Sequence, residues 1–462
     1  MRPSSALKGV IVCFVFPLQF IIAGERANIR GMGMARTFVA SSQGLDAVGI
    51  NPANLAVSDN STVTFGFLPL GIHVGSDFLD YRLYTTYFTG VETDSGRVGR
   101  YLTEADKKDI LNSFTDPVAN TTGEFETRLV GVTYRIEGIG AGAFTVTDHV
   151  GAFATVPRDY LQFLLYGNPT GSSYRFNDTK VQASWTREYA LSVGGNLRIR
   201  FLKSVAAGAA VKLVHGFGYY EVQRFNTSLV TDAHATLTGS VDFLSRRAGI
   251  DPSEVRFIDT YKLFPAVAGK GLGFDLGVRG EVNEFLSAGV SVTDIGSISW
   301  NRDTEEKVAD TTLVVDDPLD ETQRSTIESV VKGRTRATGR FSTALPAKLR
   351  IGVALQVDQL PGMEAMPGEL LLELDYNQGL VETPFSTRNP RVSMGAEYRP
   401  LSWLPVRSGV SFGGTDRMNL ALGIGVMLSM FDFELASENV TWLFVPNSFS
   451  RGSVAVGTRF RF

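Results

Sequence analysis

The chain has 462 residues, with 44 basic side chains, 48 acidic side chains and one cysteine. The acidic excess excludes a protein that holds nucleic acid by positive charge. A single cysteine excludes a disulfide framework. Because Cys13 lies in an apolar N-terminal segment, thiolate catalysis by the rest of the chain is excluded as well.

Residues 1–24 have the pattern of a secretory signal peptide. Two basic residues precede an apolar stretch over residues 9–23, and the small residues Ala23 and Gly24 suit a signal peptidase. The stretch is too short to span a membrane as a helix. A buried N-terminal helix is disfavoured because Pro17 would interrupt it. We therefore expect an exported protein.

Residues 25–60 form a second segment, which is rich in glycine and alanine. Its distinctive residues are Gly31, Gly33, Asp46, Asn51, Pro52 and Ala53. Glycines and a proline turn allow a short segment to fold back on itself in a confined space. Such residues would suit a plug inside the structure that the remaining residues form.

Alternating apolar residues dominate the chain from residue 61 to residue 462. Nine segments from Gly271 onward show one bulky apolar face and one small or charged face, and five to seven weaker ones begin near Thr62. The last segment places Phe460 and Phe462 on its apolar face. No apolar run of 18 residues follows the signal, so helical spans are not expected. Strands that face lipid must close on themselves to pair every edge.

These patterns predict an all-β fold, a closed antiparallel transmembrane β-barrel of about 14 strands in a range of 12 to 16. Short turns are expected at residues 283–284, 399–404 and 429–430, and long connections at 301–345, 379–389 and 441–449. With the C-terminus in the periplasm, the long connections lie outside the cell. Residues 91–177 do not fit this alternation of short turns and long connections.

Some connections carry helix signals. Thr103 and Asp106 have the spacing of a capping box, which predicts a helix that ends near Phe114. Weaker helices are expected over residues 157–166 and 321–331, and another begins near 251–254, where a proline occupies the first turn. The barrel is therefore expected to carry a few short loop helices.

Six charged residues on neighbouring strands are expected to face the lumen. They are Lys348, Arg350, Glu373, Asp375, Glu397 and Arg399. One interpretation is a polar track or a set of latches for the plug. The favoured interpretation is cross-strand pairing, because an inward charge needs a partner.

The acidic stretch from Asp303 to Glu321 is interpreted as a solvated loop. Divalent cations that bridge lipopolysaccharide are the alternative, but the spacing matches no calcium loop. Trp185, Trp300 and two further tryptophans lie near expected strand ends, where anchoring at the membrane interface explains them.

No catalytic residue, metal site or cofactor is predicted, and the protein is not expected to be an enzyme. The chain has four histidines and neither a serine elbow nor an HExxH motif beside them. Gly271, Gly273 and Gly277 approach a dinucleotide fingerprint, but the spacing is wrong and no helix pattern follows. A glycine-lined lumen face is the favoured interpretation.

The segment from Arg30 to Ala35, with Asp46 and Asn51-Pro-Ala, resembles the N-terminal region of FadL-type outer-membrane transporters of hydrophobic compounds. In that family such a segment forms a hatch inside the barrel, so the resemblance implies that residues 25–60 are an N-terminal plug, or hatch. Asp294-Ile-Gly296 and Asp375-Tyr-Asn-Gln-Gly379 narrow the resemblance to a FadL-like group that includes PorV, a secretion-associated barrel, and families without an assigned function. The terminal Phe460 and Phe462 resemble the signature that the outer-membrane assembly machinery reads.

The resemblance implies passive transport of small hydrophobic, fatty-acid-like molecules across the outer membrane. The alternative is a PorV-like secretion-associated or structural scaffold without transport. The implied partners are outer-membrane lipids and lipopolysaccharide, the assembly machinery and a hydrophobic small molecule, or a secretion-system protein under the alternative. Nucleic acid is not an expected partner. No fatty-acid-binding residues of the family match this chain position by position, so the resemblance names no ligand.

Overall fold

The computed structural model describes residues 26–57, 61–94, 96–197, 204–250, 262–317, 320–447 and 449–462. The predicted signal peptide and the predicted helix near residues 251–254 lie outside the described residues. Among the residues described, no helix combines the length and the apolar character that a membrane crossing requires.

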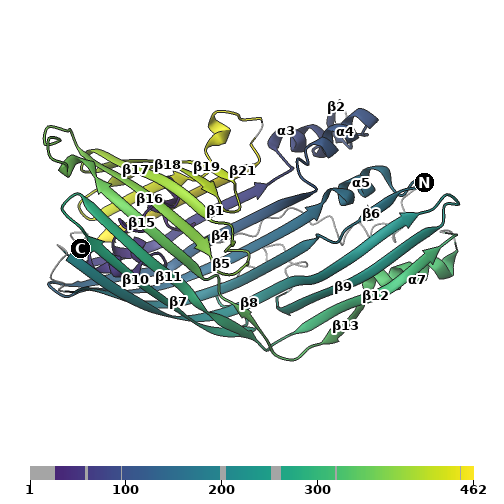
Figure 1. The fold of residues 1–462 in the computed structure, drawn as a ribbon, viewed down its shortest axis with the longest axis horizontal. Helices are drawn as coiled ribbons and strands as arrows, with labels where there is room; N and C mark the ends of the chain where they lie inside the picture. Colours follow the sequence, from purple (N-terminus) through teal and green to yellow (C-terminus); the bar gives the residue numbers. More distant parts are fainter. Residues whose placement is uncertain are drawn as a thin grey trace.

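The described residues form a closed antiparallel barrel of fourteen strands (Figure 1). Each strand pairs with the next, and the last strand pairs with the first, so the ring has no free edge. The predicted strand number is confirmed. The ring runs through β1 (Val63–Ser76), β4 (Val118–Ile136), β5 (Gly140–Pro157), β7 (Lys180–Leu197), β8 (Ser204–Thr231), β10 (Gly269–Glu281), β11 (Leu286–Trp300), β15 (Lys348–Gln356), β16 (Glu369–Gly379), β17 (Arg391–Leu401), β18 (Leu404–Gly413), β19 (Met418–Met427), β20 (Phe431–Ser437) and β21 (Arg451–Arg461).

The outer face of the barrel is apolar. On β10, Leu272 and Leu276 are exposed on the outside while Gly273 and Asp275 are buried on the inside. The same alternation runs along β16, where Leu374 is exposed. A closed barrel with this outer surface satisfies its backbone internally and presents hydrocarbon to its surroundings, which is how strands cross a bilayer. The protein is a membrane-embedded barrel.

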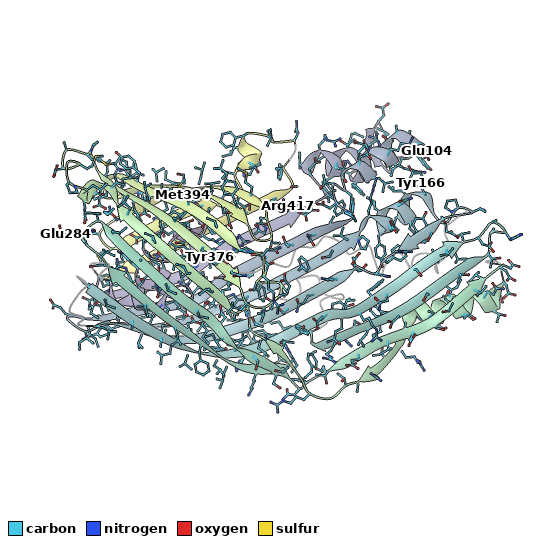
Figure 2. All side chains as sticks on the ribbon, in the orientation of Figure 1. Glu104, Tyr166, Glu284, Tyr376, Met394 and Arg417 are labelled. Atoms are coloured by element: carbon cyan, nitrogen blue, oxygen red, sulfur yellow. The ribbon has the colours of Figure 1, made fainter. Side chains whose placement is uncertain are left out.

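The two ends of the barrel differ in their connections. At one end, the turn end, Thr62 N–H donates to the Phe462 carbonyl at 2.7 Å, and β17 and β18 join through a tight turn. Long connections emerge at the opposite end, the loop end. Figure 2 shows Glu284 at the turn end, and Arg417 and Glu104 toward the loop end. The predicted division between short turns and long connections is confirmed.

The loop end carries the predicted short helices. Thr103 and Asp106 form a complete capping box at the start of α4, and each accepts a hydrogen bond from the other's backbone N–H. The helices expected over residues 157–166 and 321–331 are also present. The elements in these connections are α3 (Tyr81–Leu83), η3 (Tyr84–Phe88), β2 (Val91–Thr93), β3 (Gly96–Val98), α4 (Glu104–Asn112), α5 (Arg158–Tyr166), β6 (Ser173–Arg175), α7 (Glu321–Lys332) and η5 (Thr441–Leu443), while η4 (Val357–Gln359) lies at the turn end.

An extension of the barrel sheet projects at the loop end, at the right of Figure 1. β8 has 28 residues, about three times what a membrane-crossing strand needs. Its outer half pairs with β9 (Leu237–Gly249), which pairs with β12 (Glu305–Val315), which in turn pairs with β13 (Arg334–Ala337). We call β6, the outer half of β8, β9, β12 and β13 the loop-end sheet.

The prediction of a solvated acidic loop over residues 303–321 is wrong, because most of it is strand β12. Its glutamates pair with arginines of the neighbouring strands. Glu305 contacts Arg247 at 2.8 Å, and Glu306 contacts Arg246 at 2.7 Å and Arg336 at 2.8 Å. The two guanidinium groups beside Glu306 hold the pKa of its carboxyl below the usual value. Glu305 and Glu306 thus stabilise the pairing of β12 with its neighbouring strands.

A bulge in β11 corrects the interpretation of Trp300. Two β11 residues, Thr293 and Asp294, lie opposite Asp275 of β10, and Asp294 has a left-handed φ of 58°. The extra residue reverses the inward and outward alternation beyond it. Trp300 is therefore fully buried inside rather than anchored at the membrane interface, and it lies beside β14 (Phe341–Ala344). Trp185, next to a register shift between β7 and β8, is also buried.

The outer face generates a stability prediction. Leu374→Arg places a charge in the lipid-facing band of β16 and is expected to lower the free energy of unfolding by about 2–4 kcal/mol if it lies at the bilayer midplane. Urea unfolding of the barrel in lipid vesicles measures this change. The matched control is Thr311→Arg on an exposed position of β12, where water surrounds the new charge. An equal loss in both variants would contradict a lipid-facing position for Leu374.

Candidate functional site

Residues 26–57 lie inside the barrel and form what we call the plug. None of these residues is exposed. The segment folds into α2 (Ile29–Gly33), η1 (Gly44–Ala47) and η2 (Pro52–Ala56). Local capping sets two of these elements. The Asn28 side chain accepts a hydrogen bond from Gly31 N–H, and the Asn51 side chain accepts one from Ala53 N–H.

The Asn-Pro-Ala motif is seated directly against wall glycines. A Cβ atom on Gly208 of β8 would overlap with the backbone of Pro52 and Ala53, and one on Gly277 of β10 would overlap with the Asn51 side chain. The Asn51 amide also donates to Val278 O of the wall at 3.3 Å. Any side chain at these glycines would push the plug inward, so glycine is required for close approach.

Two predicted lumen acids hold the backbone of the plug. The Asp375 carboxylate accepts hydrogen bonds from the N–H groups of Phe38 at 2.8 Å and Val39 at 3.1 Å. Glu373, two residues earlier on β16, accepts one from Ala40 N–H at 2.6 Å. Hydrogen bonds to a carboxylate are stronger than neutral ones. β16 therefore clamps the middle of the plug.

A third predicted acid, Glu397 of β17, is surrounded by three guanidinium groups. Arg30 of the plug lies 3.0 Å from it, Arg407 of β18 lies 2.5 Å away and Arg399 lies 2.8 Å away. Arg407 continues the network to Glu434 of β20 at 2.6 Å. This arrangement includes cross-strand pairing, as expected, and it also includes the plug.

Asp46 connects the plug to the last strand of the barrel. Its carboxylate receives two hydrogen bonds from the guanidinium of Arg459 on β21, at 2.7 and 2.8 Å. Arg459 also contacts Glu434 at 2.9 Å. A bidentate pair of this kind fixes both position and orientation. The plug is thereby joined to the network that Glu397 begins.

Several wall and plug residues of this site were not singled out from the sequence. Arg26 and Arg36 of the plug both bind Glu438, which follows β20, and Arg26 also binds Glu124 of β4. Arg391 of β17 adds a third guanidinium to Glu438, at 3.1 Å. The available signal was the set of arginines within the predicted plug, since charges in a lumen require opposite charges on the wall.

The remaining predicted lumen charges lie nearer the loop end. Arg350 of β15 contacts the Thr293 hydroxyl at 2.5 Å. Lys348 lines a cavity with Asp294. The predicted Gly31 packs against the Phe38 ring, and Gly33 packs against the backbone of Gly423 on β19. The structure thus brings the plug into contact with three of the predicted acids, Glu373, Asp375 and Glu397.

Cavities lie on both sides of the plug. The turn-end cavity has a volume of about 300 Å³ and a polar lining that includes Arg30, Arg279, Glu369 and Arg399. The loop-end cavity has a volume of about 80 Å³, and its lining includes Trp300. The plug contacts strands around the ring, at strand positions between those that line these two spaces.

The histidines lie apart from one another. His73 is buried 3.3 Å from Asp416, His149 lies 3.5 Å from Glu126, and His234 is exposed in a turn. His215 stacks against Tyr189. Within the part of the chain that the structure describes, no three histidine, cysteine or carboxylate side chains gather in a way that would hold a metal ion.

The Glu397 cluster generates a second prediction. Glu397→Gln leaves two buried guanidinium groups, of Arg30 and Arg407, and the partly exposed one of Arg399 without their shared carboxylate, so the free energy of unfolding is expected to fall by about 3 kcal/mol. The matched control is Glu369→Gln, which removes a carboxylate 3.5 Å from Arg399 at a mostly exposed position and should cost less than about 1 kcal/mol. Denaturant unfolding measures both. Equal losses of unfolding free energy in the two variants would show that burial does not increase the contribution of the Glu397 cluster to stability.

Comparison with known proteins places the chain among barrels of unassigned role. No curated protein matches it. Similar solved structures include the toluene transporter TbuX of Ralstonia pickettii, 13% identical over 94% of this chain and 98% of that chain with a TM-score of 0.49. The toluene transporter TodX of P. putida is 11% identical over 96% and 99%, with a TM-score of 0.47. A FadL homologue of Pseudomonas aeruginosa is 13% identical over 96% and 99%, with a TM-score of 0.43. Residues 52–438 match the model of DUF5723, a family of unknown function, and the chain belongs to that family.

Proposed function

We propose that the protein is an outer-membrane barrel that passively transports small hydrophobic molecules, and that the plug is its gate. The observation that carries this proposal is the position of the plug between two lumen cavities, one of them lined on one side by aromatic and aliphatic side chains. A molecule that enters from the loop end meets this partly apolar cavity first. It reaches the turn end only when residues 26–57 shift.

The contacts of the plug suit a part that moves. Its apolar contacts with the wall are made largely with alanines, such as Ala206, Ala354 and Ala455. Exposing an alanine costs far less than exposing a large side chain. The other contacts are ion pairs and hydrogen bonds, which water can replace once the lumen is wet. A rearrangement of the plug therefore exposes little large apolar surface on the wall; the large apolar residues that would lose contacts, such as Met32, Met34 and Leu55, belong to the plug itself.

A second function is favoured by one specific observation, the loop-end sheet. A barrel that only passes small molecules has no evident need for four extra strands and the helices α5 and α7 beyond the membrane. A secretion-associated or structural scaffold would use such a surface to hold a protein partner. Crosslinking from the loop-end sheet in intact cells discriminates: a discrete protein partner supports the scaffold, and its absence supports transport.

A disulfide tether tests the gate. Ala53 of the plug and Ala206 of β8 pack in one cluster, and the only cysteine of the chain is Cys13 in the predicted signal peptide. With Ala53→Cys and Ala206→Cys together, oxidation is expected to stop uptake of N-phenyl-1-naphthylamine by Gram-negative cells that express the protein, and reduction is expected to restore it. The fluorescence of this probe rises when it enters phospholipid, which gives the rate directly.

The matched control joins two wall positions. Ala436 and Ala455 are register partners on β20 and β21, so a disulfide between cysteines there leaves the plug untethered. Uptake through this control should not depend on oxidation. Equal uptake by the oxidised and reduced forms of the plug-to-wall pair would sink the gating proposal. Deletion of residues 28–56 supplies the opposite test, since it should raise the conductance of the barrel in planar bilayers.

A further inference from the structure

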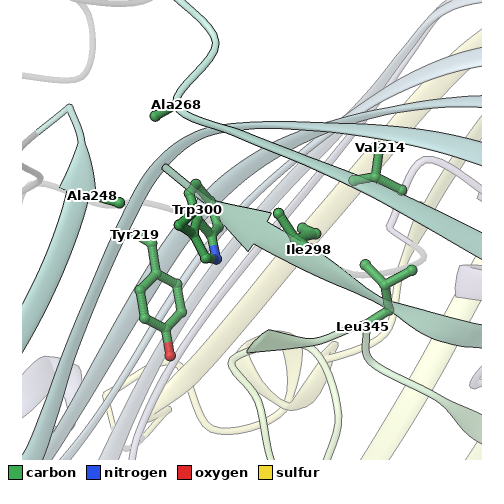
Figure 3. Packing of buried hydrophobic residues seen from close by; sticks show 7 residues of the cluster. All are labelled: Val214, Tyr219, Ala248, Ala268, Ile298, Trp300 and Leu345. Atoms are coloured by element: carbon green, nitrogen blue, oxygen red, sulfur yellow. The ribbon is translucent and has the colours of Figure 1, made fainter. Parts of the chain in front are cut away.

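The loop-end cavity has one apolar wall. Trp300 and Ile298 extend from the bulged half of β11, Val214 and Tyr219 from β8, and Leu345 from the segment before β15. Figure 3 shows these side chains gathered in one region. The ring of Trp300 lies 5.3 Å from that of Tyr219. All five residues are buried, so this wall is a shaped apolar surface inside the lumen.

An aromatic cover for the cavity comes from another part of the ring. Phe385 lies in the connection between β16 and β17, at a tight turn in which Thr383 and Ser386 exchange backbone hydrogen bonds. Its ring contacts Gly151 of β5, where a Cβ atom would overlap with it, and lies 6.3 Å from the His149 ring. An aromatic ring of the chain itself thus fills space at this site.

The opposite side of the cavity is charged and internally balanced. Lys212 lies 2.6 Å from Asp294, 2.9 Å from Asp275 and 3.3 Å from Glu188. The bulge in β11 turns Asp294 into this position. Two further cations lie close by, because Lys348 lines the cavity with Asp294 and Arg350 contacts the hydroxyl of the neighbouring Thr293. Three carboxylates therefore face three cations, and His149, which also lines the cavity, has its own carboxylate partner in Glu126 at 3.5 Å. The floor of the cavity has polar groups but no net charge.

We infer that the loop-end cavity is a binding site for neutral amphipathic molecules, with an aromatic or short aliphatic body and one hydroxyl group. The body would contact the wall of Trp300 and Leu345. The hydroxyl group would both donate to a carboxylate and accept from an ammonium group on the floor, where Glu188, Asp294 and Lys348 line the cavity. This inference rests on the proposed function and names the class of molecule that enters the gate.

The charge balance of the floor excludes ligands that carry a net negative or a net positive charge. A carboxylate or an ammonium ligand would bring an unpaired charge into a floor whose own charges are already matched, and burying an unpaired charge is costly. A pure hydrocarbon would cover the polar floor without replacing its contacts with water, which is also unfavourable. A hydroxyl group satisfies both kinds of floor group at no change in charge.

The size of the cavity limits the ligand to about one ring. A dry cavity of about 150 Å³ holds benzene, whereas this one measures about 80 Å³. A single ring therefore enters when Phe385 turns aside, and the ligand takes over the contacts of that side chain. Larger bodies would require the wall strands to separate.

Three probes with the same ring and ethyl group test the inference: 4-ethylphenol, ethylbenzene and 4-ethylbenzoate. Calorimetric titration of the full exported chain in lipid nanodiscs, with empty nanodiscs subtracted, gives each affinity. We expect 4-ethylphenol to bind at least about tenfold more tightly than either of the others, because ethylbenzene leaves the polar floor unpaired and 4-ethylbenzoate adds an unmatched charge. Equal or tighter binding of 4-ethylbenzoate would overturn the inference.

Site variants locate the binding. Leu345→Trp fills the cavity and should weaken 4-ethylphenol binding at least about tenfold, while Leu374→Trp on the lipid-facing side should leave it unchanged. Leu345→Ala enlarges the cavity and should admit 4-butylphenol, which keeps the test valid if the larger residue prevents folding. Unchanged affinity in both Leu345 variants would place the binding elsewhere.

This binding needs no movement of the plug, so its failure is separate from a failure of transport. Selective binding of 4-ethylphenol together with uptake that ignores the plug tether would retain the site and reject the gate. Unselective binding with tether-dependent uptake would reject the site and retain the gate.

Discussion

Backbone pairing in a medium without water is the constraint on which the rest of this structure depends. A strand in lipid must find a partner for every N–H and C=O group, and closure of β21 onto β1 achieves this for the whole ring. Closure in turn creates a lumen, and inward-pointing side chains and the plug occupy much of it. The inward side chains that contact the plug are glycines and alanines, which allow close approach, and charged residues, which pair with groups of the plug.

The interior charges are arranged as a network that includes the plug as one of its members. Arg30, Asp46 and Arg26 of the plug reach Glu397, Arg459 and Glu438 of the wall. Each wall residue also contacts a second charged group, so the network is continuous across β17, β18, β20 and β21. Buried charges without partners are costly, which explains why the plug carries its own arginines. These ion pairs of the wall are complete only when the plug is in place.

The alternation of residues was sufficient to predict the barrel, its strand number and its two unequal ends. Leu272 and Gly273 illustrate why: one faces lipid and the other faces the lumen, and a period of two records that difference directly. The position of Trp300 was not predictable in the same way. One extra residue at Asp294 reverses the alternation, and a single added residue has no distinctive composition. The loop-end sheet was also missed, because Glu305 and Glu306 read as solvated acids until their arginine partners on β9 are known. The sequence indicated that charged residues of the plug need partners on the wall, but it did not indicate which ones. Arg26, for example, pairs with Glu438, which lies 412 positions away in the chain.

The length of β8 gives the molecule a mechanical property. One strand carries Gly208 against the plug, Tyr219 beside the loop-end cavity, and the segment that builds the outer sheet. The loop-end sheet, the loop-end cavity and the contact site of the plug are therefore all attached to the single strand β8. We expect a shift of the loop-end sheet to act along this hydrogen-bonded strand on the position where Pro52 packs. The outer surface of the protein and the seat of its plug are thus connected through one continuous strand.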